Sequence, residues 1–133
     1  MAVADHVVGR IGAGLCVLLG VTHDDTPALA EKMASKLWHL RIMDDENGVM
    51  NRSIAECGGQ VLVISQFTLY GDASAGRRPS WLAAARPEVA EPLVDAVVEG
   101  LRELGAHVES GRFRTTMAVE LVNDGPTTVL IEL

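Results

Sequence analysis

Aromatic side chains are scarce in this chain of 133 residues: they make up 4% of the sequence, although apolar residues of all kinds make up 48%. The chain can therefore build one substantial core, and that core must be largely aliphatic. No apolar run approaches the roughly 20 residues that a membrane-spanning helix needs, so we expect no membrane partner. The first residues lack the charged and apolar regions of a signal peptide. We expect a single domain, residues 1–133, in the cytoplasm.

Positive charge and cysteine are scarce as well. The 11 Lys and Arg residues are outnumbered by 18 Asp and Glu residues, so the net charge is −7. This charge disfavours broad binding to a DNA or RNA backbone, which needs a positive field, but it leaves room for a local basic patch that grips one RNA end. Cys16 and Cys57 do not make a disulfide framework. For Cys57, a structural role is favoured over a catalytic thiol.

Common catalytic and metal-binding motifs are absent from the sequence. There is no Gly-x-Ser-x-Gly, His-Glu-x-x-His or Cys-x-x-Cys motif, and no glycine-rich phosphate loop follows a predicted strand. His23, Asp24 and Asp25 could suggest a metal site, but the same residues suit the polar segment before a helix. We therefore expect neither a metal nor a cofactor.

Hydrophobic periodicity predicts a mixed α/β fold. Strands are predicted where residues alternate or form short apolar runs, at residues 6–11, 15–21, 60–65, 107–113, 117–122 and 127–133. The first two strands should form a hairpin. Helices are predicted at about residues 27–40, after the N-cap Thr26, and at about residues 87–104, before Gly105. The order β-β-α-β-α-β-β-β indicates layers of helices and sheets rather than a doubly wound nucleotide-binding fold.

The connecting segments are predicted from their composition. Residues 44–48 form a polar turn, and residues 71–79 form a loop rich in Gly, Ala and Ser. Residues 41–43 are expected to be short and extended, and residues 51–59 to be irregular.

Ser65, Gln66, Phe67 and Thr68 stand where an apolar strand ends. A strand that ends in hydroxyl and amide side chains has stopped burying them and begins to present them. Thr68 could act there as a nucleophile, hold a water molecule, or offer its backbone N–H to an oxyanion. Ordinary β-propensity at a strand end explains the same residues. No histidine can be paired with Thr68 from the sequence, so an activated nucleophile is not established.

Gly125 and Pro126 lie between the last two predicted strands. A plain turn is one interpretation. The other is a cis peptide bond, which is mostly confined to proline and to tight turns. Such a turn could aim two carbonyl groups at an ammonium group.

Arg77 and Arg78, with Arg86 nearby, form the strongest basic cluster. A solvated loop is the simpler interpretation, but in an acidic chain this is where a phosphate would bind. Arg112 and Arg114 could add to the cluster.

Taken together, these motifs make the chain resemble the D-aminoacyl-tRNA deacylases, from about Val8 to Leu133. The likeness rests on Ser-Gln-Phe-Thr-Leu at residues 65–69 and on Val-Asn-Asp-Gly-Pro-Thr at residues 122–127, and it extends over residues 14–25, 76–80 and 111–113. Either main motif alone would be weak, but the pair at this spacing is specific. The resemblance implies a homodimer of three-layer α/β/β subunits. It implies hydrolysis of the ester that joins a D-amino acid, or glycine mischarged on tRNA(Ala), to the 3′ end of tRNA.

The resemblance also implies a substrate pocket. Its lining would comprise Ser65, Gln66, Phe67 and Thr68, with Met117 nearby. Gln66 and Thr68 are the catalytic candidates. Because an aminoacyl ester is already reactive, a positioned water and an oxyanion donor suffice. The 2′-hydroxyl of the terminal adenosine could assist catalysis, which leaves Thr68 to position rather than attack.

Two further roles follow from the resemblance. Gly125-Pro126 would be cis and would enter the partner subunit's pocket, where its backbone excludes L side chains whatever their identity. Arg77 and Arg78 would contact the tRNA.

The chain departs from the family in two places. The family opens with a further strand whose Gln-Arg pair braces the Gly-Pro loop, and because this chain has no match for it, we expect that strand to be missing and an edge to be left unpaired. Arg114, Thr115 and Thr116 stand where the family has small residues. Two alternatives therefore accompany the enzyme: a non-catalytic binder of aminoacyl-tRNA ends or D-amino acids, and a small α/β oligomer with an interaction role only.

Overall fold

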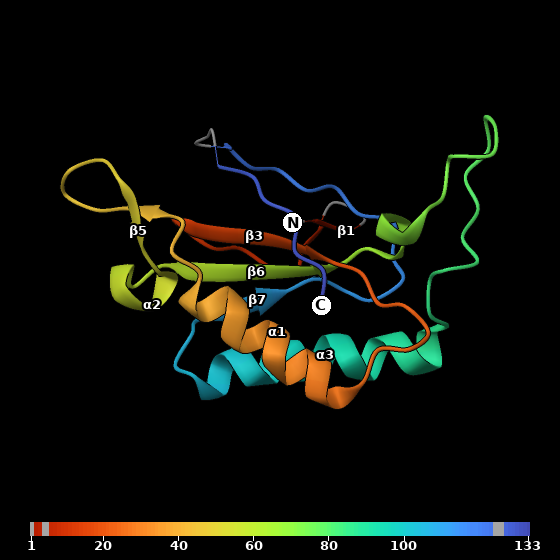
Figure 1. Ribbon diagram of the computed structural model, residues 1–133, viewed down its shortest axis with the longest axis horizontal. Helices are drawn as coiled ribbons and strands as arrows, with labels where there is room; N and C mark the ends of the chain where they lie inside the picture. Colours follow the sequence, from red (N-terminus) through yellow and green to blue (C-terminus); the bar gives the residue numbers. More distant parts are fainter. Residues whose placement is uncertain (1, 4–5, 124–126) are drawn as a thin grey trace.

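A three-stranded parallel sheet lies at the centre of the structure, a computed structural model that describes residues 2–3, 6–123 and 127–133 (Figure 1). Its strands, in spatial order, are β3 (Gly14–Leu19), β6 (Gln60–Ser65) and β7 (Val108–Ser110). Strand β6 occupies the middle because its residues 61–64 are buried in succession, as in a strand covered on both faces. The strand predicted over residues 60–65 is therefore confirmed.

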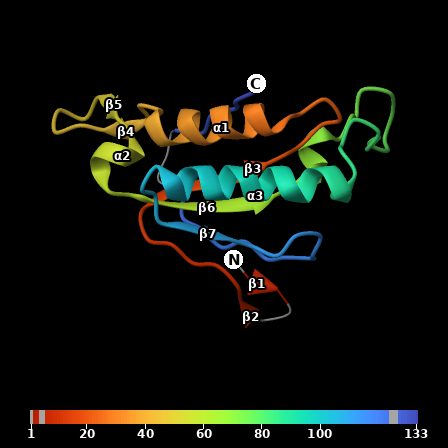
Figure 2. The same ribbon diagram turned by 90° about the horizontal axis from the view of Figure 1, so that it is seen from below.

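Two long helices, α1 (Pro27–His39) and α3 (Pro87–Glu103), cover one face of this sheet, as Figures 1 and 2 show. Thr26 caps α1 as predicted: its hydroxyl accepts a hydrogen bond from the backbone N–H of Leu29 at 3.3 Å. The helices approach closely where Gly100 faces Ala34, since a Cβ at Gly100 would lie 2.9 Å from the Ala34 methyl. Both helices lie close to their predicted boundaries.

The core between the helices and the sheet is aliphatic, as the scarcity of aromatic residues predicted. Its largest fully buried side chains are Ile54, Leu101, Val61 and Val63, each less than 2% exposed. Within the described residues, no helix is both long enough and apolar enough to cross a bilayer.

The opposite face of the sheet packs against extended chain segments rather than helices. Leu62 and Ile64 point to this side, where Val8, Met117 and Val119 pack against them. Figure 2 shows the same layering, with β1 (Ala2–Val3) and β2 (His6–Val7) on the side away from the helices. The predicted α/β fold with a three-layer arrangement is therefore confirmed.

The predicted hairpin is wrong. β2 pairs with β1, whereas β3 pairs in parallel with β6, from Gly14 opposite Gln60 to Leu19 opposite Ser65. An apolar run does not specify whether its neighbour is the nearest strand or a distant one.

The last two predicted strands, residues 117–122 and 127–133, are not strands in the described part of the chain, apart from an isolated bridge at Ala118. Met117 and Val119 nevertheless face inward while Ala118 is exposed. The alternation thus correctly predicted which side chains are buried. It could not predict ladder pairing, which also needs a neighbouring backbone in register.

Residues 51–59 were expected to be irregular, and this is also wrong. They contain β5 (Met50–Arg52), which pairs with β4 (Met43–Asp44), and the one-turn helix α2 (Ile54–Cys57). Ser53 and Glu56 form a reciprocal capping box at the start of α2. This Ser-x-x-Glu spacing is a recognisable helix-start signal in the sequence.

Gly14 sets the close approach of β3 to β6. A Cβ at this position would lie 1.8 Å from the carbonyl oxygen of Gln60, which is backbone and cannot rotate away. We expect Gly14→Ala to lower the free energy of unfolding by about 3 kcal/mol, measured by urea denaturation.

Gly12→Ala is the matched control, because its Cβ would lie 3.8 Å from the nearest atom, the Gln60 side-chain oxygen. Its effect should stay within about 0.5 kcal/mol. Equal effects of the two substitutions would contradict the inferred clash.

Candidate functional site

The candidate site residues begin where the central strand ends. The N–H of Gln66 donates to the carbonyl of Leu19 at 2.8 Å, and beyond this bond the chain turns into the 3₁₀-helix η1 (Phe67–Tyr70). Because β3 and β6 are parallel, both end at this edge, which is where open α/β sheets commonly place ligands. The structure thus brings Ser65, Gln66, Phe67 and Thr68 together at one end of the molecule.

Gln66 and Thr68 contact each other directly. The side-chain amide Nε2 of Gln66 donates a hydrogen bond to Oγ1 of Thr68. An amide N–H cannot accept the hydroxyl proton of Thr68, so this contact does not activate a nucleophile. It orients the hydroxyl and leaves its O–H free to donate to a substrate atom.

Backbone donors lie beside this pair. The first N–H groups of a helix have no acceptor within it, and those of Phe67 and Thr68 find none elsewhere in the described residues. The next donors along η1 are satisfied, since Leu69 N–H bonds the Gln66 carbonyl at 3.2 Å and Gly71 N–H bonds the Thr68 carbonyl at 3.0 Å. Two adjacent N–H groups are therefore available for an oxygen atom of a ligand.

Tyr70, the last residue of η1, anchors this helix to β3's end of the sheet. Its ring lies against Gly20, where a Cβ would come within 3.1 Å of two ring carbons. Burial raises the pKa of the Tyr70 hydroxyl, and the nearby Asp25 carboxylate adds to the shift. The phenol is therefore neutral at neutral pH, and the ring contributes by packing against Gly20.

Trp81 is a site neighbour that the sequence reasoning did not identify. Its ring meets Phe67 edge to face, with ring centroids 5.5 Å apart and planes at 71°. Gly71 lies against the same indole, since a Cβ there would be 2.4 Å from Cζ3. The signal available in the sequence was composition. Because aromatic residues are scarce, a Trp in a polar loop segment is unusual for this chain.

Arg77 and Arg78 lie in the loop of residues 72–80, which extends from the same end of the molecule as η1 (Figure 1). Asp72 and Ser80 close the loop through two backbone hydrogen bonds of 2.8 and 2.7 Å. Both arginines are exposed, and neither pairs with a carboxylate in the described part of the chain. The predicted loop is therefore present, and it carries both arginines at the surface.

Asp72 is the acidic group nearest in sequence to these arginines, and it is already engaged. Its carboxylate accepts hydrogen bonds from the hydroxyl and the N–H of Ser74, at 2.5 and 2.9 Å. These two bonds lower the pKa of Asp72. The charge therefore holds the base of the loop rather than neutralising an arginine.

His23 and Asp25 also serve as structural anchors. The Nε2 atom of His23 lies 2.5 Å from the Leu82 carbonyl, and the Asp25 carboxylate accepts the Thr22 N–H at 2.9 Å. The Thr22 hydroxyl donates to the Ala83 carbonyl at 2.6 Å. These contacts hold the chain that follows Trp81 in place.

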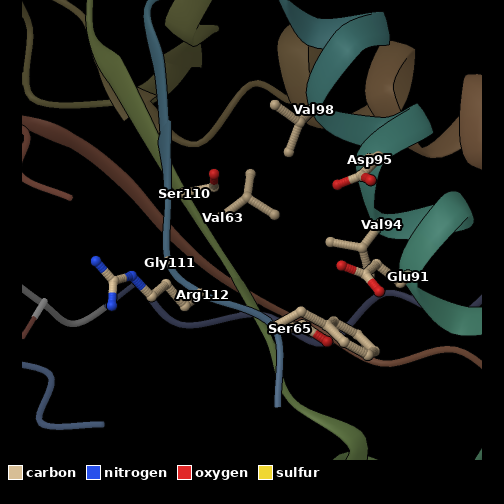
Figure 3. Close-up of a pocket in the computed structure, with 10 residues that line it drawn as sticks. Val63, Ser65, Glu91, Val94, Asp95, Val98, Ser110, Gly111 and Arg112 are labelled. Carbon is tan, nitrogen blue, oxygen red and sulfur yellow. The ribbon is translucent and has the colours of Figure 1, made fainter. Parts of the chain in front are cut away.

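A cavity of about 300 Å³ lies between α3 and the ends of β6 and β7 (Figure 3). Among the predicted site residues that the structure describes, Ser65 alone lines it; Val63, Val94, Val98 and Phe113 form its apolar walls. Figure 3 shows the carboxylates of Glu91 and Asp95 on the α3 side and the guanidinium of Arg112 turned away from them.

Met117 does not line this cavity. It packs with Leu62 and Ile64 on the face of the sheet opposite the helices. Gly125 and Pro126 lie outside the described residues. On either side of them, the amide of Asn123 donates to the Thr128 hydroxyl at 3.4 Å, which joins the two flanks of that segment.

Arg114 has a φ of 59°, in the left-handed region that non-glycine residues rarely adopt. It follows Phe113 in a turn, where the Thr115 hydroxyl donates to the Arg112 carbonyl at 2.9 Å. The departure from small residues noted in the sequence therefore coincides with an uncommon backbone conformation.

Comparison with known proteins gives consistent results. A family model described as D-Tyr-tRNA(Tyr) deacylase matches residues 1–132. A D-aminoacyl-tRNA deacylase of Symbiobacterium thermophilum is 59% identical over 132 residues, covering 99% of this chain and 87% of that protein. One from Streptomyces griseus is 59% identical over 131 residues, covering 98% and 85%.

Solved structures show the same fold. A protein titled c-Myc DNA Unwinding Element Binding Protein superimposes with a TM-score of 0.89 at 34% identity, covering 96% of this chain and 87% of that one. A probable eukaryotic D-amino acid tRNA deacylase superimposes with a TM-score of 0.74 at 20% identity, covering 88% and 83%. The second likeness concerns the fold alone.

The packing of Trp81 on Gly71 can be tested by a double-mutant cycle. Gly71→Ala should lower the free energy of unfolding by about 2 kcal/mol, because the added methyl displaces the indole ring. In a Trp81→Leu background the same substitution should cost about 1 kcal/mol less, since the obstructing ring is gone. Chemical denaturation of the four proteins measures the coupling, and additive costs would show that the two residues do not touch.

Proposed function

Because this chain belongs to the D-Tyr-tRNA(Tyr) deacylase family, we propose that it hydrolyses the ester bond that joins a D-amino acid to the 3′ end of tRNA. The observation that carries the proposal is the Gln66–Thr68 pair beside two free backbone N–H groups, at the carboxyl edge of the sheet. Residues 1–133 would act as one deacylase domain in the cytoplasm, where charged tRNA is used.

The free N–H groups of Phe67 and Thr68 suit the ester carbonyl. As water attacks, the carbonyl oxygen gains negative charge, and donors already in place stabilise that charge without rearrangement. Backbone donors do this for any amino acid. The enzyme therefore needs no contact with the substrate side chain at the reacting centre.

Thr68 would act as a positioning group. Its Oγ1 accepts from Gln66, so its O–H can donate to the ester or hold the attacking water. The proton that water loses must reach the leaving 3′-oxygen, and the neighbouring 2′-hydroxyl of the terminal adenosine could relay it, by accepting the proton from water as it donates its own to the 3′-oxygen. Gln66 then acts through Thr68, by fixing the direction of that hydroxyl.

Stereochemical selection would come from Gly125-Pro126 of a partner subunit. In this proposal a cis peptide bond there aims its carbonyl groups at the substrate ammonium, and the ester is fixed by the Phe67 and Thr68 N–H groups. An L side chain would then collide with backbone, whereas a D side chain or the hydrogen of glycine would not.

A homodimer is part of this proposal. Several large apolar side chains near the relevant segments are exposed: Phe67 at 55%, Val122 at 93% and Leu130 at 83%. Val122 and Leu130 lie on the two sides of the Gly125-Pro126 segment. Coverage of these side chains by a second copy would bring that segment to the partner's pocket.

Hydrolysis of D-Tyr-tRNA and L-Tyr-tRNA tests the proposed function directly. We expect rapid hydrolysis of the D ester and only background hydrolysis of the L ester, measured by the release of radiolabelled tyrosine. Binding of D-Tyr-tRNA without ester loss would favour the non-catalytic binder. Neither binding nor hydrolysis would favour an interaction role for the fold.

Thr68→Ala tests whether this residue positions or attacks. We expect kcat to fall about tenfold, because one hydrogen bond is lost while the backbone N–H groups remain. Thr68→Ser keeps the hydroxyl and should stay close to the parent enzyme. The parent enzyme and the Thr68→Ser variant should each hydrolyse a substrate that ends in 2′-deoxyadenosine far more slowly than the normal substrate. Complete loss of turnover in Thr68→Ala with intact binding would identify Thr68 as the nucleophile.

A further inference from the structure

Three of the chain's few aromatic residues gather in one short stretch. The sequence holds two Trp, one Tyr and two Phe residues, and Phe67, Tyr70 and Trp81 lie within residues 67–81. Tyr70 is half-buried, but Phe67 is 55% and Trp81 43% exposed. A chain that builds its core from aliphatic side chains therefore keeps two of its five aromatic rings at the surface, beside the candidate site.

These two rings are held in place rather than loosely exposed. The edge-to-face contact with Phe67 fixes the tilt of the Trp81 indole, with centroids 5.5 Å apart. Gly71 packs against the indole, and the backbone on both sides of Trp81 is tied down by the Asp72–Ser80 bonds and by the Ala84 N–H, which donates to the Trp81 carbonyl at 3.0 Å. A fixed and partly exposed ring loses little freedom when a flat ligand stacks on it.

The charge in the loop that precedes Trp81 indicates which flat ligand is suited. Arg77 and Arg78 lie in the loop whose closing residue, Ser80, directly precedes Trp81, and both are exposed without a carboxylate partner in the described residues. Rings beside unpaired guanidinium groups are the combination with which proteins hold unpaired nucleotides, since the ring stacks on the base and the cation meets the phosphate.

We propose that Trp81, with Phe67 at its edge and Arg77 and Arg78 in the adjoining loop, forms a stacking platform for an unpaired nucleobase at the 3′ end of RNA. This inference rests on the proposed function, which supplies an RNA with a single-stranded end. It adds a specific contact: a base stacked on Trp81 outside the reacting centre, which holds the end of the RNA while the ester lies against Phe67 and Thr68.

Fluorescence binding of uncharged RNA tests the platform separately from hydrolysis. In a Trp38→Phe background Trp81 is the one tryptophan left. Three hairpins serve as probes: one with a single-stranded ACCA 3′ end, one with abasic sugars in that overhang, and one with a blunt end. The ACCA hairpin should quench Trp81 and bind about tenfold more tightly than the abasic hairpin, because only bases can stack.

Substitutions then separate stacking from charge. These variants lack the Trp81 fluorophore, so their binding is measured by the fluorescence anisotropy of dye-labelled hairpins. Trp81→Leu should weaken binding of the ACCA hairpin about tenfold and abolish its advantage over the abasic hairpin, whereas Trp81→Phe should keep most of that advantage. Arg77→Gln and Arg78→Gln should weaken both hairpins alike and reduce the slope of log affinity against log salt by about 0.7 each. Thermal melting confirms that each variant folds, and Trp81→Phe keeps the test available if Trp81→Leu does not.

Several outcomes would overturn the platform. One is equal binding of the ACCA and abasic hairpins, or ACCA binding that Trp81→Leu leaves unchanged. Another is a change in particle mass on light scattering with Trp81→Leu, which would assign the rings to contact between two copies. If D-Tyr-tRNA is not hydrolysed but Trp81-dependent binding persists, the proposed function fails and the platform stands. If hydrolysis occurs and Trp81 has no effect on binding, the platform fails alone.

Discussion

The parallel pairing of β3 with β6 is the constraint on which the site depends. The four buried residues 61–64 make β6 a central strand, and the register places Leu19 opposite Ser65, so both strands end at one edge. The last hydrogen bond, from Gln66 N–H to the Leu19 carbonyl, leaves the following N–H groups without strand partners. A shift of one residue in this register would move Ser65 and Thr68 away from their present positions. The apolar core thus determines where the polar chemistry stands.

A site of this kind needs few specialised groups because its substrate is activated. An aminoacyl ester needs an oxyanion donor and a positioned water more than a strong nucleophile. The structure offers an amide, a hydroxyl and two backbone N–H groups, none of which changes charge near neutral pH. The charged side chains at this end of the molecule are not part of that group. Arg77 and Arg78 lie in the loop of residues 72–80, and Glu91 and Asp95 line the cavity. In the proposed function, recognition of the RNA and reaction at the ester would therefore be separate in space.

The sequence was informative where a local signal is sufficient. Thr26 marked the start of α1, and the apolar run marked β6. It was insufficient where the outcome depends on distant partners. Nothing in residues 15–21 specifies β6 rather than residues 6–11 as the neighbouring strand, and residues 117–122 alternate without forming a ladder. Trp81 belongs to the same class, because its contact with Phe67 depends on how the loop of residues 72–80 folds back. The capping box of Ser53 and Glu56 is, by contrast, a local signal in the sequence that marks the start of α2.

The turn at Arg114 shows how the two faces of the sheet constrain each other. Phe113 packs toward the helices and lines the cavity with Ser65, whereas Met117 packs on the opposite face with Leu62 and Ile64. The chain must cross from one layer to the other within these few residues, and the crossing places Arg114 at a φ of 59°. A left-handed conformation costs a non-glycine residue about 1 kcal/mol, and it persists because the surrounding contacts determine it. Burial of Phe113 and Met117 on opposite faces supplies that determination. Arg112 and Arg114, on the two sides of Phe113, are both exposed, and Arg112 lines the cavity.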